Sequence, residues 1–194
     1  ENIGMTARAM DNFSLSKLSI VSPRDGWPSK RAEVSSKHAS DIINNAKIFN
    51  NLDEAISNHD LVIATSNRQR FITKKSYNSF NIMKKKINDF KNVAILFGPE
   101  NSGLSNQDLR LANFIFTIPT DNINKSLNLS HAVSIISHEL FNRKIVITKK
   151  TNTLKNEKVS KRDLAKFMDF LINELNFRGF FKPIEKKESM IDNI

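Results

Sequence analysis

Short apolar runs of strand length alternate along this chain with segments of helical periodicity, and this alternation constrains the fold most. The clearest runs are 18–21, 61–64, 93–97 and 114–118, which are rich in β-branched and aromatic residues and end at polar residues, glycine or proline. Between them, apolar residues recur as on one face of a helix. Strands that are apolar throughout are typical of a parallel sheet covered by helices on both faces. The pattern therefore predicts an α/β fold with a Rossmann-like parallel sheet.

The segment 113–140 joins the last of these strands to a polar loop and a helix. Its helical face consists of Leu129, Ala132, Val133, Ile136 and Leu140. The loop brings Ser126 and Asn128 to the start of that helix. Loops after the carboxyl ends of strands are where open α/β sheets bind their ligands. Because Asn and Ser are also favoured N-caps, a plainly capped helix is the alternative.

Composition narrows the class of protein. The 194 residues are 39% hydrophobic and carry a net charge of +10, which favours an anionic partner such as nucleic acid, with a solvated lysine-rich surface as the alternative. The absence of cysteine excludes disulfides and a thiol nucleophile, and the four histidines lack carboxylates at ligand spacing, so we expect no metal. No apolar run approaches the roughly 20 residues of a membrane span, and no signal peptide is visible. A soluble cytoplasmic protein is the simplest interpretation.

Three motifs occur in order along the chain. The first is N-x-G-x-x-x-R at residues 2–8, the second is GPENSGLS at 98–105, and the third includes SLNLSHAV at 126–133. Together they resemble the motifs of the SpoU-type RNA 2'-O-methyltransferases of the SPOUT superfamily, over about residues 1–145. Within that family, residues 2–24 and 126–133 look most like the TrmJ-like tRNA methyltransferases, which modify the ribose of nucleotide 32 in the anticodon loop.

The resemblance implies a fold that topology rules alone would not suggest. In SPOUT proteins the last strand and helix thread through a preceding loop and form a C-terminal trefoil knot, whereas general rules favour an unknotted sheet. The resemblance also implies a homodimer in which the knotted helices pack together. A strand precedes the first motif in the family, so we expect that this chain lacks its first strand.

The methyl donor implied by the resemblance is S-adenosyl-L-methionine, held by backbone groups of three loops. The corresponding cofactor-binding residues are Thr65, Ser66, Asn67, Gly98, Ile118, Lys125, Ser126 and Leu127. The sequence has no Gly-rich phosphate loop, which agrees with a donor that lacks phosphates. A glycine at position 98 permits close backbone approach, although an ordinary turn after a strand would use one too.

The polar residues of the motifs are the expected catalytic residues: Arg8, Asn2, Glu100, Ser126 and Asn128. The guanidinium of Arg8 can hold the target phosphate at two points and bring the ribose hydroxyl to the donor. An arginine base has been suggested in this family, but an ordinary guanidinium stays protonated. We therefore expect positioning and charge stabilisation from Arg8, and the general base is left open.

Basic residues outside the motifs complete the expected RNA contacts. Arg68 and Arg70 follow the 61–64 strand and can hold RNA phosphates, although this loop also reads as a donor loop or an ordinary basic turn. The residues predicted to bind RNA are Arg8, Arg68, Arg70, Lys161 and Arg162.

The composition shifts toward the C-terminus. We expect a methyltransferase domain at residues 1–148, followed by a linker and a short C-terminal helical extension at 149–194. Ser160 is the expected N-cap of the helix, and Gly179 its expected end. The helix carries an apolar stripe of Leu164, Phe167, Met168, Leu171 and Leu175. This stripe must be covered either by its own domain or by a partner subunit.

These observations predict an S-adenosylmethionine-dependent enzyme that methylates the ribose 2'-hydroxyl of RNA, with tRNA as the first expectation. An rRNA methyltransferase of the same fold is the alternative within the class. A non-catalytic RNA-binding protein that kept the fold is the rival from another class.

Overall fold

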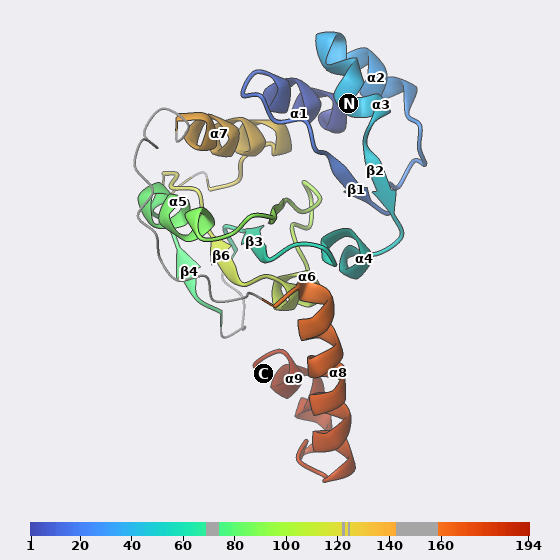
Figure 1. The fold of residues 1–194 in the computed structure, drawn as a ribbon, viewed down its shortest axis with the longest axis vertical. Helices are drawn as coiled ribbons and strands as arrows, with labels where there is room; N and C mark the ends of the chain where they lie inside the picture. Colours follow the sequence, from blue (N-terminus) through green and yellow to red (C-terminus); the bar gives the residue numbers. More distant parts are fainter. Residues whose placement is uncertain (69–73, 122, 124, 143–158) are drawn as a thin grey trace. The chain divides into compact units, whose positions relative to one another are not determined.

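The computed structural model describes residues 1–68, 74–121, 123, 125–142 and 159–194 (Figure 1). The chain divides into two compact units. The first unit combines Glu1–Ala55 with Thr120–Lys155, and the second unit combines Ile56–Pro119 with Asn156–Ile194. Helix α4 (Leu52–Ile56) leads along the chain from the first unit to the second.

The first unit consists of helices around a two-stranded parallel sheet. Its elements are α1 (Asn2–Asp11), β1 (Ser19–Val21), α2 (Lys30–Ser36), the 3-10 helix η1 (Lys37–Ala39), α3 (Ser40–Asn44), β2 (Lys47–Phe49) and α7 (Leu129–Phe141). Helix α1 packs against both α2 and α7, which joins the beginning of the chain to a helix far along it (Figure 1). The ring of Phe13 lies edge-on to that of His138, with centroids 5.6 Å apart, and strengthens the contact with α7.

The α1–α2 contact depends on a glycine of the first motif. A Cβ built on Gly4 would meet the backbone oxygen of Ala32 and the hydroxyl of Ser35. Gly4 therefore lets the two helices approach more closely than any other residue would permit. Its place in the N-x-G-x-x-x-R pattern has a packing reason that the sequence alone does not reveal.

The second unit contains a four-stranded parallel sheet in the order β4-β6-β3-β5. Its strands are β3 (Leu61–Thr65), β4 (Ser76–Tyr77), β5 (Val93–Leu96) and β6 (Phe114–Phe116), with α5 (Phe80–Asn88) and α6 (Asn106–Leu111) between them. The core is apolar, and its largest fully buried side chains include Phe116, Ile63, Met83, Leu109 and Val62. Burial of this set explains why the strands read as continuous apolar runs.

The C-terminal helical extension belongs to the second unit and comprises α8 (Lys161–Phe177), the 3-10 helix η3 (Ile184–Lys186) and α9 (Lys187–Ile191). The hydroxyl of Ser160 accepts a hydrogen bond from the backbone of Asp163, so the expected N-cap is confirmed. Gly179, with φ of +68°, follows the C-cap residue Arg178, as expected for the end of this helix.

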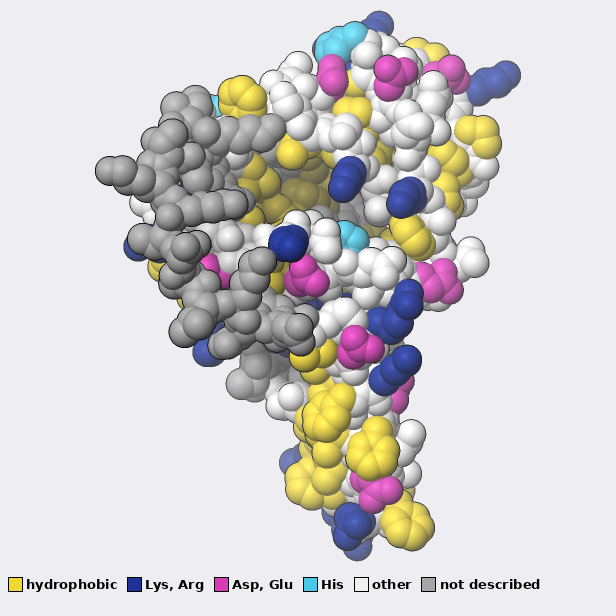
Figure 2. Space-filling view, in the orientation of Figure 1, with side chains coloured by type: hydrophobic (Ala, Val, Ile, Leu, Met, Phe, Trp, Pro, Cys, Tyr) yellow, Lys and Arg dark blue, Asp and Glu magenta, His cyan; other side chains and the backbone are white. Residues whose placement is uncertain are grey.

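The expected burial of the apolar stripe on this chain's own domain is not observed. No residue of α8 is buried among the residues that the structure describes. The side chain of Phe167 is 57% exposed, and Figure 2 shows hydrophobic side chains gathered over this helix in the lower part of the view. The other expectation, that a partner subunit covers the stripe, stays a prediction.

The α/β fold with parallel strands is confirmed, with two differences in detail. The described strands form two sheets, because β1 and β2 pair only with each other there. Between the 61–64 and 93–97 runs the pattern predicted helix, but Ser76 and Tyr77 pair with β6, and α5 begins only at Phe80. Non-local pairing has overridden the local pattern there. The predicted domain boundary at 148/149 lies outside the described residues.

None of the helices that the structure describes has the length and apolar character needed to cross a membrane.

Candidate active site

Three loops follow the carboxyl ends of neighbouring parallel strands in the second unit. Strand β3 lies between β5 and β6, so the chain leaves all three strands at the same edge of the sheet. This edge is where open α/β sheets bind ligands. The structure therefore brings together five of the predicted cofactor-binding residues, which are Thr65, Ser66, Asn67, Gly98 and Ile118.

Two threonine hydroxyls join these strand ends. The hydroxyl of Thr65 donates to the backbone oxygen of Leu96 at 2.6 Å, which ties β3 to β5. The hydroxyl of Thr117 donates to the backbone oxygen of Ser66 at 2.8 Å, which ties β6 to the loop after β3. Thr65, which was predicted to bind the cofactor, therefore also holds two strands together. Thr117 was not predicted from the sequence. An isolated Thr after a strand gives no signal that could have identified it.

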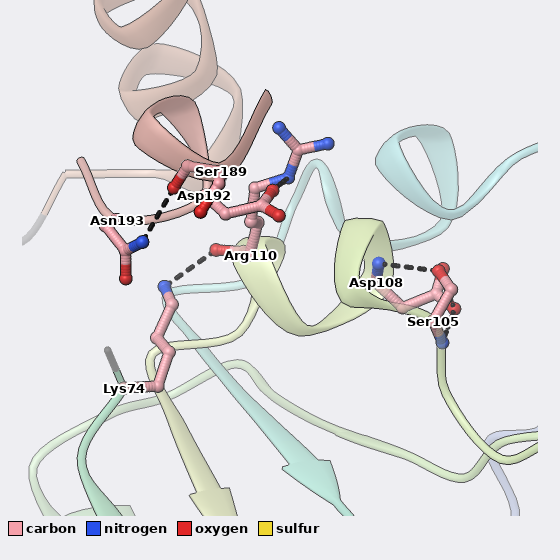
Figure 3. Close-up of polar contacts among 7 residues, drawn as sticks. All are labelled: Lys74, Ser105, Asp108, Arg110, Ser189, Asp192 and Asn193. Carbon is pink, nitrogen blue, oxygen red and sulfur yellow. Dashed lines mark hydrogen bonds and ion pairs between the residues drawn. The ribbon is translucent and has the colours of Figure 1, made fainter. Parts of the chain in front are cut away.

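The loop after β5 is compact because of Gly98. A Cβ at this position would meet backbone atoms of Gly103 and Leu104. The space that Gly98 leaves open is therefore occupied by the backbone of the same loop. The closest contacts of Gly98 are with the protein itself. The same loop ends in a capping box, in which Ser105 and Asp108 exchange hydrogen bonds at the start of α6 (Figure 3). Glu100, a predicted catalytic residue, is exposed and lies between Gly98 and the capping box at Ser105.

Arg68 spans two of the loops. Its Nη2 donates to the backbone oxygen of Asn101 at 2.8 Å, and its backbone N–H donates to the hydroxyl of Ser66 at 3.2 Å. The predicted RNA contact of Arg68 stays a prediction, and the structure adds a contact within the protein. Arg70, the other arginine of this loop, lies outside the described residues.

The remaining predicted catalytic and cofactor-binding residues belong to the first unit. Arg8 is exposed on α1, and Asn2 is the first residue of the same helix. The oxygen of the Asn128 side chain accepts hydrogen bonds from the backbone and the hydroxyl of Ser130, at 2.9 and 2.7 Å. Asn128 is therefore the N-cap of α7, and the capping alternative is confirmed for it. The segment just before it carries the last predicted residues, Lys125, Ser126 and Leu127, of which the first two are exposed.

Lys161 makes an internal contact rather than extending freely from the surface. Its Nζ donates to the backbone oxygen of Leu111 at 2.7 Å. Burial, and then repulsion by the charge of Lys74, lowers the pKa of Lys161 to about 8. Arg162 is exposed, and its Nη2 makes a long contact of 3.5 Å with the side-chain oxygen of Asn58. RNA binding by these two residues stays a prediction, and Arg162 is the more accessible of them.

Lys74 lies at the same end of α6 and was missed by the sequence analysis. Its Nζ donates to the backbone oxygen of Arg110 at 2.7 Å (Figure 3). It also donates to the backbone oxygen of Ala112 at 2.7 Å. Together with Lys161 it satisfies carbonyl groups that the helix end leaves without partners. Burial lowers the pKa of Lys74. The guanidinium of Arg110 in turn pairs with Asp192 at 2.8 Å and holds the end of the chain there (Figure 3).

The chemistry of the strand-end loops fits S-adenosylmethionine. The polar groups there include backbone amides, hydroxyls and the amide side chains of Asn67 and Asn101, beside the charged Arg68 and Glu100. The described part of these loops has no array of glycine N–H groups that would select a phosphate. The donor's adenosine and amino acid parts need such hydrogen-bonding groups at the edge of an apolar core.

Comparisons with known proteins agree with this arrangement. The model of the SpoU rRNA Methylase family matches residues 1–138. The tRNA (cytidine/uridine-2'-O-)-methyltransferase TrmJ of Sodalis glossinidius is 35% identical over 185 residues, covering 93% of this chain and 72% of the relative. The crystal structure of TrmJ from Z. mobilis ZM4 superimposes with a TM-score of 0.85 at 32% identity, covering 98% of this chain and 81% of that one.

A more distant likeness concerns the fold alone. The SpoU methyltransferase AviRb from Streptomyces viridochromogenes, solved in complex with the cofactor AdoMet, has a TM-score of 0.58 at 19% identity, covering 74% of this chain and 56% of that one.

Because the family model covers most of the chain and a relative of 35% identity covers nearly all of it, the chain belongs to the SpoU rRNA methylase family and is a methyltransferase.

Proposed function

We propose that this protein transfers a methyl group from S-adenosylmethionine to the ribose 2'-hydroxyl of a tRNA nucleotide. The observation that carries the proposal is the likeness to TrmJ along nearly the whole chain, which includes the C-terminal helical extension as well as the three motifs. The loops at the carboxyl ends of β3, β5 and β6 support it, because they offer a site for the donor. AviRb, which shares the fold, binds AdoMet.

The target that we propose is nucleotide 32 in the anticodon loop, as a cytidine or a uridine. The support is the resemblance of residues 2–24 and 126–133 to TrmJ-like enzymes, together with the Sodalis relative, which is a tRNA (cytidine/uridine-2'-O-)-methyltransferase. The cytoplasm, where tRNA is modified, is the expected location.

The residues that we propose to bind the donor come from four segments of the chain. The loops after β3, β5 and β6 would contribute the first five, and the segment before α7 the last three: Thr65, Ser66, Asn67, Gly98, Ile118, Lys125, Ser126 and Leu127. When bound, S-adenosylmethionine supplies an electrophilic methyl group on a sulfonium sulfur.

Arg8 is the residue to which we assign the central role. Its guanidinium would hold the phosphate next to the target ribose and stabilise negative charge as the 2'-oxygen loses its proton. Asn128 fixes the start of α7 through its contacts with Ser130, and so would hold Ser126 in place. Glu100 and Asn2 would orient these groups by hydrogen bonding.

We also propose the trefoil knot and the homodimer. The support for both is membership of the SpoU family and the overall likeness to TrmJ.

The direct test is methyl transfer from tritiated S-adenosylmethionine to purified RNA, followed by mapping of 2'-O-methylated positions. Label in tRNA at nucleotide 32 is the expected result. Label in ribosomal RNA with none in tRNA would favour the rRNA enzyme. Tight RNA binding without any transfer would identify a non-catalytic RNA-binding protein and contradict the proposal.

A mutation separates catalysis from binding at Arg8. Arg8→Ala should lower turnover by roughly 100-fold or more, because a group that acts in the transition state is lost. It should leave tRNA affinity within a few-fold of the parent, because phosphate contacts are shared among many residues. Arg24→Ala is the matched control, since Arg24 is also an exposed arginine of the first unit but pairs with Asp25 at 3.1 Å. Transfer by Arg8→Ala at the parental rate would remove Arg8 from the catalytic set.

A further inference from the structure

The loops after β3, β5 and β6 are joined to one another by side chains as well as by backbone pairing. We propose that Arg68 and Thr117 are positioning residues, which hold these loops in the arrangement that binds the methyl donor. The inference rests on the proposed function, because it assumes that the loops bind S-adenosylmethionine. It changes the expected role of Arg68 from an RNA contact to a contact within the protein.

Thr117 extends the pairing of β3 and β6 beyond the end of both strands. The last paired residues of these strands are Thr65 and Phe116. One residue further, the backbone N–H of Ser66 donates to the oxygen of Phe116 at 3.2 Å, and the hydroxyl of Thr117 donates to the oxygen of Ser66 at 2.8 Å. Ser66 is thus held through both its N–H and its carbonyl group.

The backbone of Thr117 is itself fixed from the other side. Its N–H donates to the oxygen of Tyr77 in the neighbouring strand β4 at 2.9 Å. Thr117 therefore connects the loop after β3 to the edge strand β4 through its backbone as well as to β6. Removing the hydroxyl would leave the half-buried carbonyl of Ser66 without this donor.

Arg68 holds the same loop to the loop after β5. The hydrogen bond from Nη2 to the oxygen of Asn101 is 2.8 Å long and is strengthened by the positive charge of the donor. A Cβ built on Gly103 would lie 4.0 Å from Nε of Arg68, so the guanidinium passes close to this second loop at another point. Arg68 also donates its backbone N–H to the hydroxyl of Ser66. The two side-chain hydrogen bonds that join the loops, from Thr117 and from Arg68, are called the two ties below, and both involve residues that bond to Ser66.

Preorganisation is the physical consequence. A loop that samples many conformations must lose that freedom when the donor binds, and this loss weakens binding. The two ties remove the freedom beforehand. Losing either tie should therefore weaken donor binding before RNA is present, which a phosphate contact would not do.

The experiment compares donor binding with RNA binding in four variants of the full chain. Arg68→Ala and Thr117→Val remove the ties, whereas Thr117→Ser keeps the hydroxyl and Arg68→Lys keeps a charged donor. Calorimetry with S-adenosylhomocysteine, without RNA, should show Kd raised about 5-fold by each of the first two, as expected for one hydrogen bond. Thr117→Ser should restore the parental value, and Arg68→Lys should restore part of it. In steady state, the KM for S-adenosylmethionine should rise by more than kcat falls.

Filter binding of tRNA over a salt series supplies the opposing measurement. For Arg68→Ala, the expected result is an unchanged dependence of tRNA affinity on salt. A slope reduced by about 0.7 to 0.9, with an unchanged Kd for S-adenosylhomocysteine, would show a phosphate contact and overturn the inference. Unchanged values in both assays would overturn it too. Failure of the parent itself to bind S-adenosylhomocysteine would instead contradict the proposed function, so the two failures are distinguishable.

Discussion

Gly98 lies directly after β5, at the point where the chain turns into the loop that carries Glu100. Glycine is required at position 98 because backbone atoms of Gly103 and Leu104 occupy the place where a Cβ would be. The second glycine of the loop, Gly103, is needed for a different reason. It adopts φ of +66°, and among the described residues a Cβ there would come within 4.0 Å of Nε of Arg68 alone.

This difference predicts that alanine substitutions at the two glycines lower stability by different amounts. Gly98→Ala should lower the free energy of unfolding by about 3 kcal/mol, because backbone atoms must move apart. Gly103→Ala, the control in the same loop, should lower it by only about 1 to 2 kcal/mol, from left-handed strain alone. Urea unfolding measures both. The donor affinity of Gly98→Ala should fall as well, and a Gly98→Ala variant with parental stability and affinity would contradict the packing seen here.

At the scale of elements, the short helix α6 is the point where the C-terminal extension is held to the sheet of the second unit. Lys74 and Lys161 both donate to carbonyl groups at its C-terminal end, and the backbone N–H of Lys161 donates to the backbone oxygen of His59 at 3.2 Å. Two positive charges near one helix end suit the helix dipole but repel each other. Their burial has a further cost, which appears as the lowered pKa of Lys161.

Stability should therefore rise with pH in a definite window. Below pH 8 the amine of Lys161 is protonated in the folded and unfolded chains alike, and the cost of burying its charge applies fully. Between about pH 8 and 10.5 the folded chain releases this proton while the unfolded chain keeps it, so the free energy of unfolding increases. The gain should stay below about 1 kcal/mol per pH unit, because water still reaches part of the group.

The measurement is urea unfolding at several values of pH between about 7 and 10, for the parent and for Lys161→Met. The variant should lose most of the rise, while the contribution of Lys74 remains in both proteins. An equal rise in parent and variant would show that Lys161 does not titrate as its burial implies.

At the scale of the whole molecule, surfaces that remain exposed are informative about assembly. Helix α7 buries Val133 and Ile136 within the first unit, so part of the face expected at a dimer interface is already covered by this chain. Ile135, on the same helix, is 36% exposed. Phe141, at the end of α7, is exposed to the same extent. We expect Ile135 to contact the partner subunit.

Light scattering at micromolar concentration should give a mass near twice that of the monomer. Ile135→Glu should shift the protein toward the monomer, because a buried, unpaired carboxylate at an interface is costly. Ile82→Glu is the control, since Ile82 is 41% exposed on α5 of the second unit. A fully active parent that scatters as a monomer would remove the dimer from the proposal.

Features that depend on neighbours along the chain could be predicted from the sequence. The apolar runs identified β3, β5 and β6, since a strand buried on both faces must be apolar at every position. The N-terminal ends of two helices could be predicted because a capping residue bonds to atoms close to it in sequence. Ser160 and Asn128 cap α8 and α7 through atoms only two or three residues away. The order of the three motifs was sufficient to indicate the family that the comparisons then showed.

Contacts between distant parts of the chain became visible in the folded structure alone. The pairing of Ser76 and Tyr77 with β6, the tie from Thr117 to Ser66, and the contact of Lys161 with Leu111 join residues far apart in sequence. Periodicity cannot report them, because it records which face of an element is buried and not what lies against that face. Lys161 shows the consequence: its charge and position suggested a surface contact, but packing of α8 against the end of α6 placed the amine on a carbonyl group instead.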